Sequence, residues 1–286
     1  IVCFLATFFV LIPLPWHWRT RNIPTVASII WLAQANFFRG VSAIIWRDNV
    51  VRHHLVYGDI VLQLQVASLW GLTAAAFCIT RHLEFVSSPR YATTGLNDER
   101  NRKRFEIFMC WISPWIYCGL HLIVQGHRFD IIENIGPSIT TYWSWASLWL
   151  FFLPPIMLSL GTSFYAARAF YWFFQRRAQF RDLLSSSGLS HSRYLRLMGL
   201  AVAEFLGTVS CNSYVIYVDS KTPLRPWISW QNVHSDFRRV DQYPMALLSS
   251  YWYKQYWVVW SFYPYGAFLF FVFFGFGREA TLEYKK

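Results

Sequence analysis

Long apolar runs separated by short polar segments dominate the chain. Runs of at least about 18 mostly apolar residues lie at 23–46, 55–79, 105–125, 143–174, 197–218 and 253–276, and an apolar stretch over 1–15 precedes them. Lipid offers backbone amides no hydrogen-bond partners, so such runs cross a membrane as helices. The pattern predicts an all-α membrane protein with seven transmembrane helices, in which 1–15 is the end of a first helix.

The composition supports this interpretation. Of the 286 residues, 55% are hydrophobic and only 14% are charged, whereas soluble domains contain roughly 25% charged residues. The seven apolar runs cover 163 residues, which leaves little chain for a separate soluble domain. We therefore expect residues 1–286 to form one seven-helix membrane domain.

The distribution of Lys and Arg predicts the orientation. The segments 16–22, 80–104, 175–196 and 277–286 hold 16 basic residues in 64 positions, whereas 47–54, 126–142 and 219–252 hold 7 in 59. Basic residues concentrate in cytoplasmic loops. The first set is therefore expected in the cytoplasm, with the N-terminus outside and the C-terminus inside. This topology also explains most of the net charge of +11 without a nucleic-acid partner.

Signals of enzyme chemistry are close to absent. The sequence contains no HExxH, GxSxG or GxxxxGK motif, and no group of His, Asp and Glu at one depth that would hold a catalytic metal. The five cysteines lie in or at the edge of apolar runs without CxxC spacing, so neither a disulfide framework nor a zinc site is indicated. We expect no catalytic activity, no metal and no cofactor.

Polar residues inside the predicted spans are candidates for function. Arg39 and Asp59 fall in the outer halves of adjacent spans and are expected either to pair or, equally, to snorkel outward and to cap a helix. Gln63, one turn below Asp59, extends the polar stripe inward. His121, in span four, is more typical of a helix-contact residue than of a ligand.

Arg168 and Glu204 lie at similar depth in the inner halves of spans five and six. The matching depths predict a salt bridge between these helices. A purely structural pair is favoured over a lock that opens on activation, because isolated ion pairs in bundles often only fix packing.

The loops expected in the cytoplasm are basic, and 175–196 also carries Phe180, Leu183 and Leu184 among its charges. Such a surface can dock an intracellular protein or attract anionic lipid, and the sequence favours neither alternative. Lys254 and the aromatic residues at the start of span seven are expected to anchor that helix at the membrane interface.

Several segments along the whole chain resemble the fungal lipopeptide mating-pheromone receptors, the a-factor receptor family of class D G-protein-coupled receptors, and in particular their basidiomycete members. These segments are Leu11–Asn22 (LIPLPWHWRTRN), Arg39–Trp46, Leu120–Glu133, the pair Pro154 and Pro155, Ser192–Met198 and Phe273–Ala280. The resemblance implies a multi-pass plasma-membrane receptor for a farnesylated peptide pheromone, which activates a heterotrimeric G protein and mating signalling. Whether the chain forms a homodimer stays open.

Within this interpretation the outer polar residues become candidate ligand contacts and the inner basic residues become candidate G-protein contacts. The expected ligand-binding residues are Arg39, Asp59, Gln63, His121, Arg128, Asp130, Glu133, Tyr142, Lys254 and Trp257. The expected G-protein-coupling residues are Arg21, Arg81, Arg104, Arg176, Arg177, Arg193 and Arg196, and the expected switch is Arg168 with Glu204.

Two other protein classes are compatible with the same span pattern. A transporter or channel would use the intramembrane charges to line a permeation path. An intramembrane lipid enzyme is disfavoured by the missing catalytic cluster. Ligand-stimulated nucleotide exchange on a Gα subunit separates a receptor from a transporter.

Overall fold

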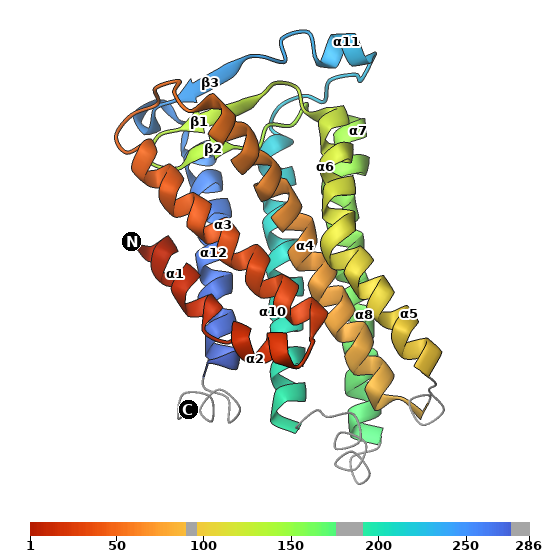
Figure 1. The fold of residues 1–286 in the computed structure, drawn as a ribbon. Coiled ribbons are helices and arrows are strands. Elements are labelled where there is room, and N and C mark those ends of the chain that lie inside the picture. The colour runs from red at the N-terminus through yellow and green to blue at the C-terminus, as the bar shows by residue number, and fades with distance from the viewer. Residues whose placement is uncertain (90–95, 176–190, 276–286) are drawn as a thin grey trace.

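The computed structural model describes residues 1–89, 96–175 and 191–275, and within them seven helical segments are long and apolar enough to cross a membrane. The predicted bundle of seven transmembrane helices is confirmed (Figure 1). The segments are Val2–Arg19, Ile23–Ile45, Leu55–Ser87, Asn97–Val124, Trp145–Gln175, Tyr194–Asp219 and Ser250–Phe274.

Some of these spans are single helices and others are composite. The composite spans are α1 (Val2–Leu11) with α2 (Leu14–Arg19), α5 (Leu96–Ile107) with α6 (Ser113–Val124), and α7 (Trp145–Ser147) with α8 (Leu153–Gln175). The single helices are α3 (Ile23–Ile45), α4 (Leu55–Ser87), α10 (His191–Asp219) and α12 (Ser250–Phe274).

Two composite spans contain a wide π-helical turn next to proline. The turn Phe108–Ile112 lies two residues before Pro114, and the turn Leu148–Phe152 lies two residues before Pro154. Proline cannot donate the helical hydrogen bond, so the backbone is rearranged locally around it. The regular α-helix is thus interrupted just before Pro114 in one span and just before Pro154 in the other.

The helix α4 lies at the centre of the bundle and packs against α3, α6, α8 and α10. It continues to Ser87, about two turns beyond its expected end at residue 79. The polar residues Arg81, His82 and Glu84 end the apolar run. However, Leu83 and Val86 are fully buried against the neighbouring helices, so packing extends the helix where hydropathy does not.

A three-stranded sheet covers one end of the bundle, and the span pattern did not predict it. It consists of β1 (Phe129–Ile132), β2 (Gly136–Ser138) and β3 (Val240–Tyr243), in the order β2-β1-β3. The strand β1 pairs antiparallel with β2 and parallel with β3. Gly136 has φ +93°, and a Cβ there would lie 2.6 Å from Ser42 Cβ, so the hairpin needs glycine at this position.

The sheet is fixed to the helices by an apolar cluster. Trp46, Phe129 and Ile131 are fully buried and pack with Leu62 of α4 and Val240 of β3. We call this end of the bundle the sheet end, and the end where α2 lies the opposite end (Figure 1). The short helix α11 (Trp230–Val233) and the 3-10 turn Met245–Leu247 belong to the loop that contains β3.

Candidate ligand site and interior cavity

A bidentate ion pair joins the hairpin to the bundle at the sheet end. Arg128 Nε donates to Asp59 Oδ1 at 2.7 Å and Arg128 Nη2 to Asp59 Oδ2 at 2.5 Å. The hydrogen bond to Asp59 raises the pKa of Arg128. Two parallel charge-assisted bonds give this contact a defined geometry. The partner of Asp59 is therefore Arg128, one of the other predicted ligand residues.

Arg39 does not pair with Asp59, which rules out the first of the two alternatives that the sequence left open. Arg39 is 6% exposed, its guanidinium carbon lies 3.8 Å from the centre of the Tyr263 ring, and its Nη1 donates to the Ala35 carbonyl at 3.4 Å. Burying an arginine is tolerated when an aromatic face and a carbonyl replace water. Arg39 thus contacts α12, whereas Asp59 is turned toward the hairpin.

The parallel pairing of β1 and β3 brings four charged or titratable side chains together. Asp130 and Asp241 are register partners, and His127 Nε2 lies 2.7 Å from Asp130 Oδ1 and 3.7 Å from Asp241 Oδ2. Arg239 lies 3.2 Å from Asp241 and 3.2 Å from His127 Nδ1. Guanidinium only donates, so Nδ1 accepts and Nε2 carries the proton that Asp130 accepts.

This His127–Asp130–Asp241 cluster also has a spacing that could hold a metal ion, with ligand atoms all within 4.8 Å of one another. The sequence did not indicate it, because its members come from two distant loops. Burial raises the pKa of Asp130, while His127 and Arg239 act in the opposite direction. Arg239 supplies the positive charge that offsets the two adjacent carboxyl groups.

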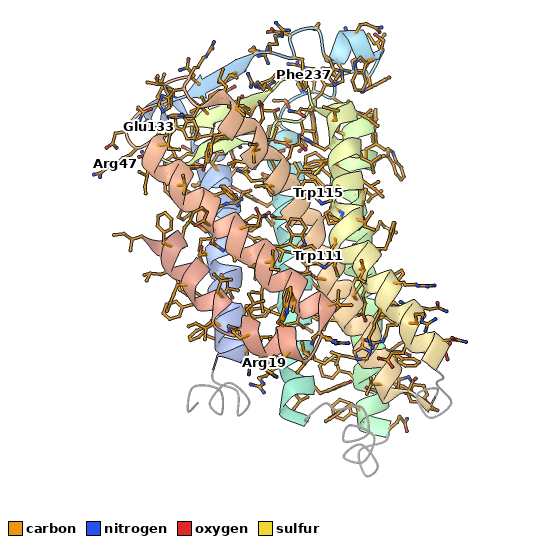
Figure 2. The ribbon with its side chains drawn as sticks, viewed as in Figure 1. Arg19, Arg47, Trp111, Trp115, Glu133 and Phe237 are labelled. Atoms are coloured by element: carbon orange, nitrogen blue, oxygen red, sulfur yellow. The ribbon has the colours of Figure 1, made fainter. Side chains whose placement is uncertain are left out.

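Further polar contacts tie the sheet-end loops to one another. Glu133 Oε2 accepts from the Met245 amide at 2.7 Å, and Gln65 Nε2 donates to the Pro137 carbonyl at 2.9 Å. Tyr142 donates to the Pro226 carbonyl at 3.4 Å, and Arg225 lies over its ring at 5.9 Å. Figure 2 shows Glu133 and Arg47 at the sheet end, far from Arg19 at the opposite end.

The remaining predicted ligand residues are dispersed. His121 is fully buried in α6, with Nε2 3.1 Å from the Thr140 carbonyl, which is the helix-contact role favoured by the sequence. The backbone carbonyl of Gln63 accepts from Cys118 Sγ at 3.4 Å. Lys254 is exposed on α12, and Trp257 packs edge-on against Trp260 at 5.4 Å.

The predicted G-protein-coupling residues that the structure describes lie at the opposite end. Arg21 and Arg104 are exposed, Arg81 lies over the Phe105 ring at 4.4 Å, and Arg196 Nη1 donates to the Phe273 carbonyl at 3.3 Å. Arg176 and Arg177 lie outside the described residues, as does the side chain of Arg193.

The predicted salt bridge between Arg168 and Glu204 is wrong. Arg168 Nε donates to Glu84 Oε1 at 3.2 Å, so α8 pairs with α4. Glu84 was assigned to a loop because the apolar run ends at residue 79, yet it lies on the extended part of α4 and is 3% exposed. The similar depth of Arg168 and Glu204 did not determine which way either side chain points.

Tyr194 forms a second junction near the Arg168–Glu84 pair. Its hydroxyl donates to the Ala169 carbonyl of α8 at 3.1 Å and accepts from Ser87 Oγ of α4 at 2.9 Å. Its ring stacks on Phe173 and is fully buried. One side chain of α10 thus bonds to both α4 and α8. The segment Ser192–Met198 that supported the family resemblance contains this residue, but no sequence pattern indicated its partners.

Glu204 lies in the wall of a largely apolar cavity lined by residues of α3, α4, α10 and α12, with a volume of about 120 Å³. Its Oε1 accepts from Thr208 Oγ1 at 2.7 Å, and its Oε2 is buried without a hydrogen-bond partner among the described residues. Tyr263, which carries Arg39 on its ring, also lines this cavity.

Comparison with known proteins finds relatives among fungal pheromone receptors. The chain is 38% identical over its full length to the "Pheromone B beta 1 receptor" of Schizophyllum commune, covering 53% of that protein. It is 29% identical over 99% of its length to "Pheromone receptor 1" of Mycosarcoma maydis, and the match covers 80% of that protein. It is 26% identical over 76% of its length to the "Pheromone M-factor receptor" of Schizosaccharomyces pombe, and the match covers 61% of that protein.

The chain spans about half the length of the Schizophyllum receptors that it matches. No solved structure matches it. The model of the family described as STE3, pheromone A receptor, matches residues 1–286, from the first helix to the last. With seven candidate spans and this match over its whole length, the chain belongs to the pheromone A receptor family.

Proposed function

We propose that this chain is the seven-helix part of a plasma-membrane receptor for a farnesylated peptide pheromone, and that it activates a heterotrimeric G protein. The family match over residues 1–286 carries this proposal. The relatives' names specify pheromone receptors, and the lipid group and the G protein are the partners that the family resemblance implies. The sheet end faces outside and the opposite end faces the cytoplasm, in agreement with the density of basic residues.

The peptide part of the ligand is recognised at the sheet end. The Asp59–Arg128 pair and the His127–Asp130–Asp241 cluster place charges of both signs on the loops that cover the bundle. Discrimination among related peptides depends on repulsion of the wrong charges as well as on attraction of the right ones. A farnesyl group adds affinity by apolar burial, at about 0.8 kcal/mol per CH₂, but does not distinguish peptide sequences.

The G protein binds at the opposite end. Arg21 and Arg104 are exposed there. The segment 175–196, most of which lies outside the described residues, contains five basic residues. A ligand changes the population of the active state only by binding that state more tightly than the resting state. We propose that the pheromone changes the relative positions of α4, α8 and α10, which are joined at Tyr194.

Nucleotide exchange on a fungal Gα provides the test. The full-length receptor in nanodiscs is mixed with the G protein and with candidate synthetic peptides, each with and without the farnesyl group. At least one farnesylated peptide is expected to accelerate exchange, and its unmodified form to be at least tenfold less potent. A transporter or channel would leave exchange unchanged with every peptide, which would contradict the proposal.

Two variants connect the response to the sheet end. Asp59→Asn breaks the bidentate pair with Arg128 and is expected to reduce peptide potency more than surface expression. Asp48→Asn is the matched control, because Asp48 is a 76% exposed carboxyl group of the same end. Equal potency of the Asp59 variant and the control would limit Asp59 to a packing role.

A further inference from the structure

The interior cavity is almost entirely apolar. Of its polar lining groups, Ser28 and Thr73 donate to carbonyls of their own helices and Thr208 donates to Glu204. Glu204 Oε2 is the described polar atom of the wall that is buried without a partner. Apolar cavities of this size stay dry and accept apolar guests. The lining therefore suits a hydrocarbon chain rather than a peptide.

The cavity reaches the lateral surface of the bundle between α10 and α12. Tyr265 lines it and is 66% exposed, and Gly207 and Phe262 are half-buried on the facing helices. A Cβ on Gly207 would lie 2.7 Å from the Phe262 ring. Phe262 therefore packs against Gly207 and stands at this entrance, where its rotation would widen the opening.

On the sheet-end side of the cavity, Arg39 of α3 covers Tyr263. Arg39 is 6% exposed, and its guanidinium carbon lies 3.8 Å from the centre of the Tyr263 ring. A hydrocarbon chain that arrives from the bilayer meets the entrance between α10 and α12 instead, without crossing the polar loops.

The distance of the entrance from the sheet end determines how long a hydrocarbon chain must be to reach it. Gly207 is 12 residues from the end of α10 at Asp219, and Phe262 is 12 residues from the start of α12 at Ser250, so both lie about 18 Å from the sheet end of their helices. An extended chain advances about 1.2 Å per bond. A farnesyl main chain of about 12 carbons then spans about 14 Å, whereas a geranyl chain of about 8 carbons spans only about 10 Å.

We propose that the cavity between α3, α4, α10 and α12 receives the distal end of the prenyl chain of a lipopeptide ligand, which enters from the bilayer past Phe262. This rests on the proposed function and assigns a place to the lipid part of that ligand. Anchored about 4 Å below the sheet-end termini of α10 and α12, a farnesyl chain reaches the level of the entrance, whereas a geranyl chain from the same anchor ends about 4 Å short of it. A prenyl chain in the cavity would contact α10 and α12 next to Glu204.

Photolabelling tests this assignment. The probe is S-farnesyl-cysteine methyl ester with a diazirine at the distal isoprene, applied to the full-length receptor in nanodiscs and mapped by mass spectrometry. Labels are expected on α10 and α12 around Gly207 and Phe262. Unlabelled farnesyl-cysteine is expected to compete at least tenfold better than geranyl-cysteine.

Cavity-filling variants supply the matched comparison. Ala203 lines the cavity, whereas its neighbour Val202 is 37% exposed on the lateral surface. Ala203→Phe is expected to reduce labelling at least fivefold, and Val202→Phe to leave it unchanged. Ala203→Leu, a smaller change, is expected to give an intermediate loss if the phenylalanine variant fails to fold.

Three results would overturn the assignment. They are labelling confined to the sheet-end loops, equal labelling of the Ala203 and Val202 variants, and equal competition by palmitic acid, which would identify the cavity as a site for membrane acyl chains. Each can occur in a receptor that still stimulates nucleotide exchange with a lipopeptide. In contrast, failure of every lipopeptide to stimulate exchange would reject the proposed function itself.

Discussion

Asp130 is a buried carboxyl group at the junction of two sheet-end loops, and its surroundings determine how pH acts on the fold. Burial raises its pKa, although His127 and Arg239 lower it. The folded state therefore binds this proton more tightly than the unfolded state does. The free energy of unfolding contributed by Asp130 is then highest at low pH and decreases as pH rises from the ordinary aspartate pKa through the raised value.

Replacing Asp130 by Asn should remove this contribution. The amide cannot ionise, and its oxygen still accepts the hydrogen bond from His127. We expect the stability of Asp130→Asn relative to the wild-type protein to increase as pH is raised from 4 to 7. The measurement is the melting temperature of the purified protein across this range. A constant difference between the two proteins would show that Asp130 does not titrate in this window.

The Arg168–Glu84 contact makes a second prediction at the residue scale. Arg168 bonds to Glu84 at 3.2 Å, so a double-mutant cycle with Arg168→Gln and Glu84→Gln should give a coupling energy within about 0.5–3 kcal/mol. The same cycle with Glu204→Gln should give about zero, because Glu204 bonds instead to Thr208. Equilibrium unfolding in mixed micelles measures both, and a larger coupling with Glu204 would reject the observed pairing.

These two acidic residues show what the sequence does and does not determine about a site. Apolar run length located Arg168 and Glu204 within their spans, because membrane thickness limits the depth of each position. The partner of a charge also depends on the rotation of its helix, which two positions at equal depth do not specify. Glu84 was missed because it lies on helical turns that are stabilised by neighbouring helices rather than by lipid.

At the scale of elements, Tyr194 connects α10 to both α4 and α8 through two hydrogen bonds. Tyr194→Phe keeps the ring that stacks on Phe173 but removes both bonds. Each contributes about 0.5–1.5 kcal/mol. If activation moves α10 away from α4 and α8, these bonds exist only in the resting state. The variant then destabilises the resting state and leaves the free energy of the active state unchanged. Ligand-independent nucleotide exchange should then rise by about 5–150-fold, which corresponds to about 1–3 kcal/mol.

The control for this prediction is Tyr171→Phe, since Tyr171 is 55% exposed on the same helix as Ala169. It should leave basal exchange at the wild-type level when surface expression is matched. Unchanged basal exchange in Tyr194→Phe, with normal expression and a normal response to ligand, would show that the junction is not broken on activation.

The hydropathy pattern predicted the transmembrane helices but not the sheet. Every transmembrane helix was predicted from its apolar run. The sheet was not predicted, because β1 and β3 are short and their parallel pairing joins Phe129 to Val240 across more than a hundred residues. The cluster of His127, Asp130 and Asp241 exists only through this pairing, so neither loop alone indicated it.

At the scale of the whole molecule, the described parts of the two loop sets that differ in basic-residue density lie at opposite ends of the bundle (Figure 1). Loops 47–54, 126–142 and 219–249 meet at the sheet end, where the strands and the Asp59–Arg128 pair occur. The charge rule then predicts that the sheet end faces outside. A ligand from outside and a G protein inside would thus act on the same helices, α10 and α12, from opposite ends.

Glycosylation mapping tests this orientation without assuming any ligand. The sequence contains no Asn-x-Ser/Thr acceptor site, so an inserted site reports its own location. A site inserted at Ile228, which is 69% exposed in the sheet-end loop, should be glycosylated and lose the added mass on endoglycosidase treatment. The same insertion in 90–95 should remain unmodified, because acceptor sites are glycosylated only on the luminal side, which becomes the outside of the cell. The reverse pattern would place the basic loops outside and reject both the orientation and the assignment of Arg21 and Arg104 to G-protein contacts.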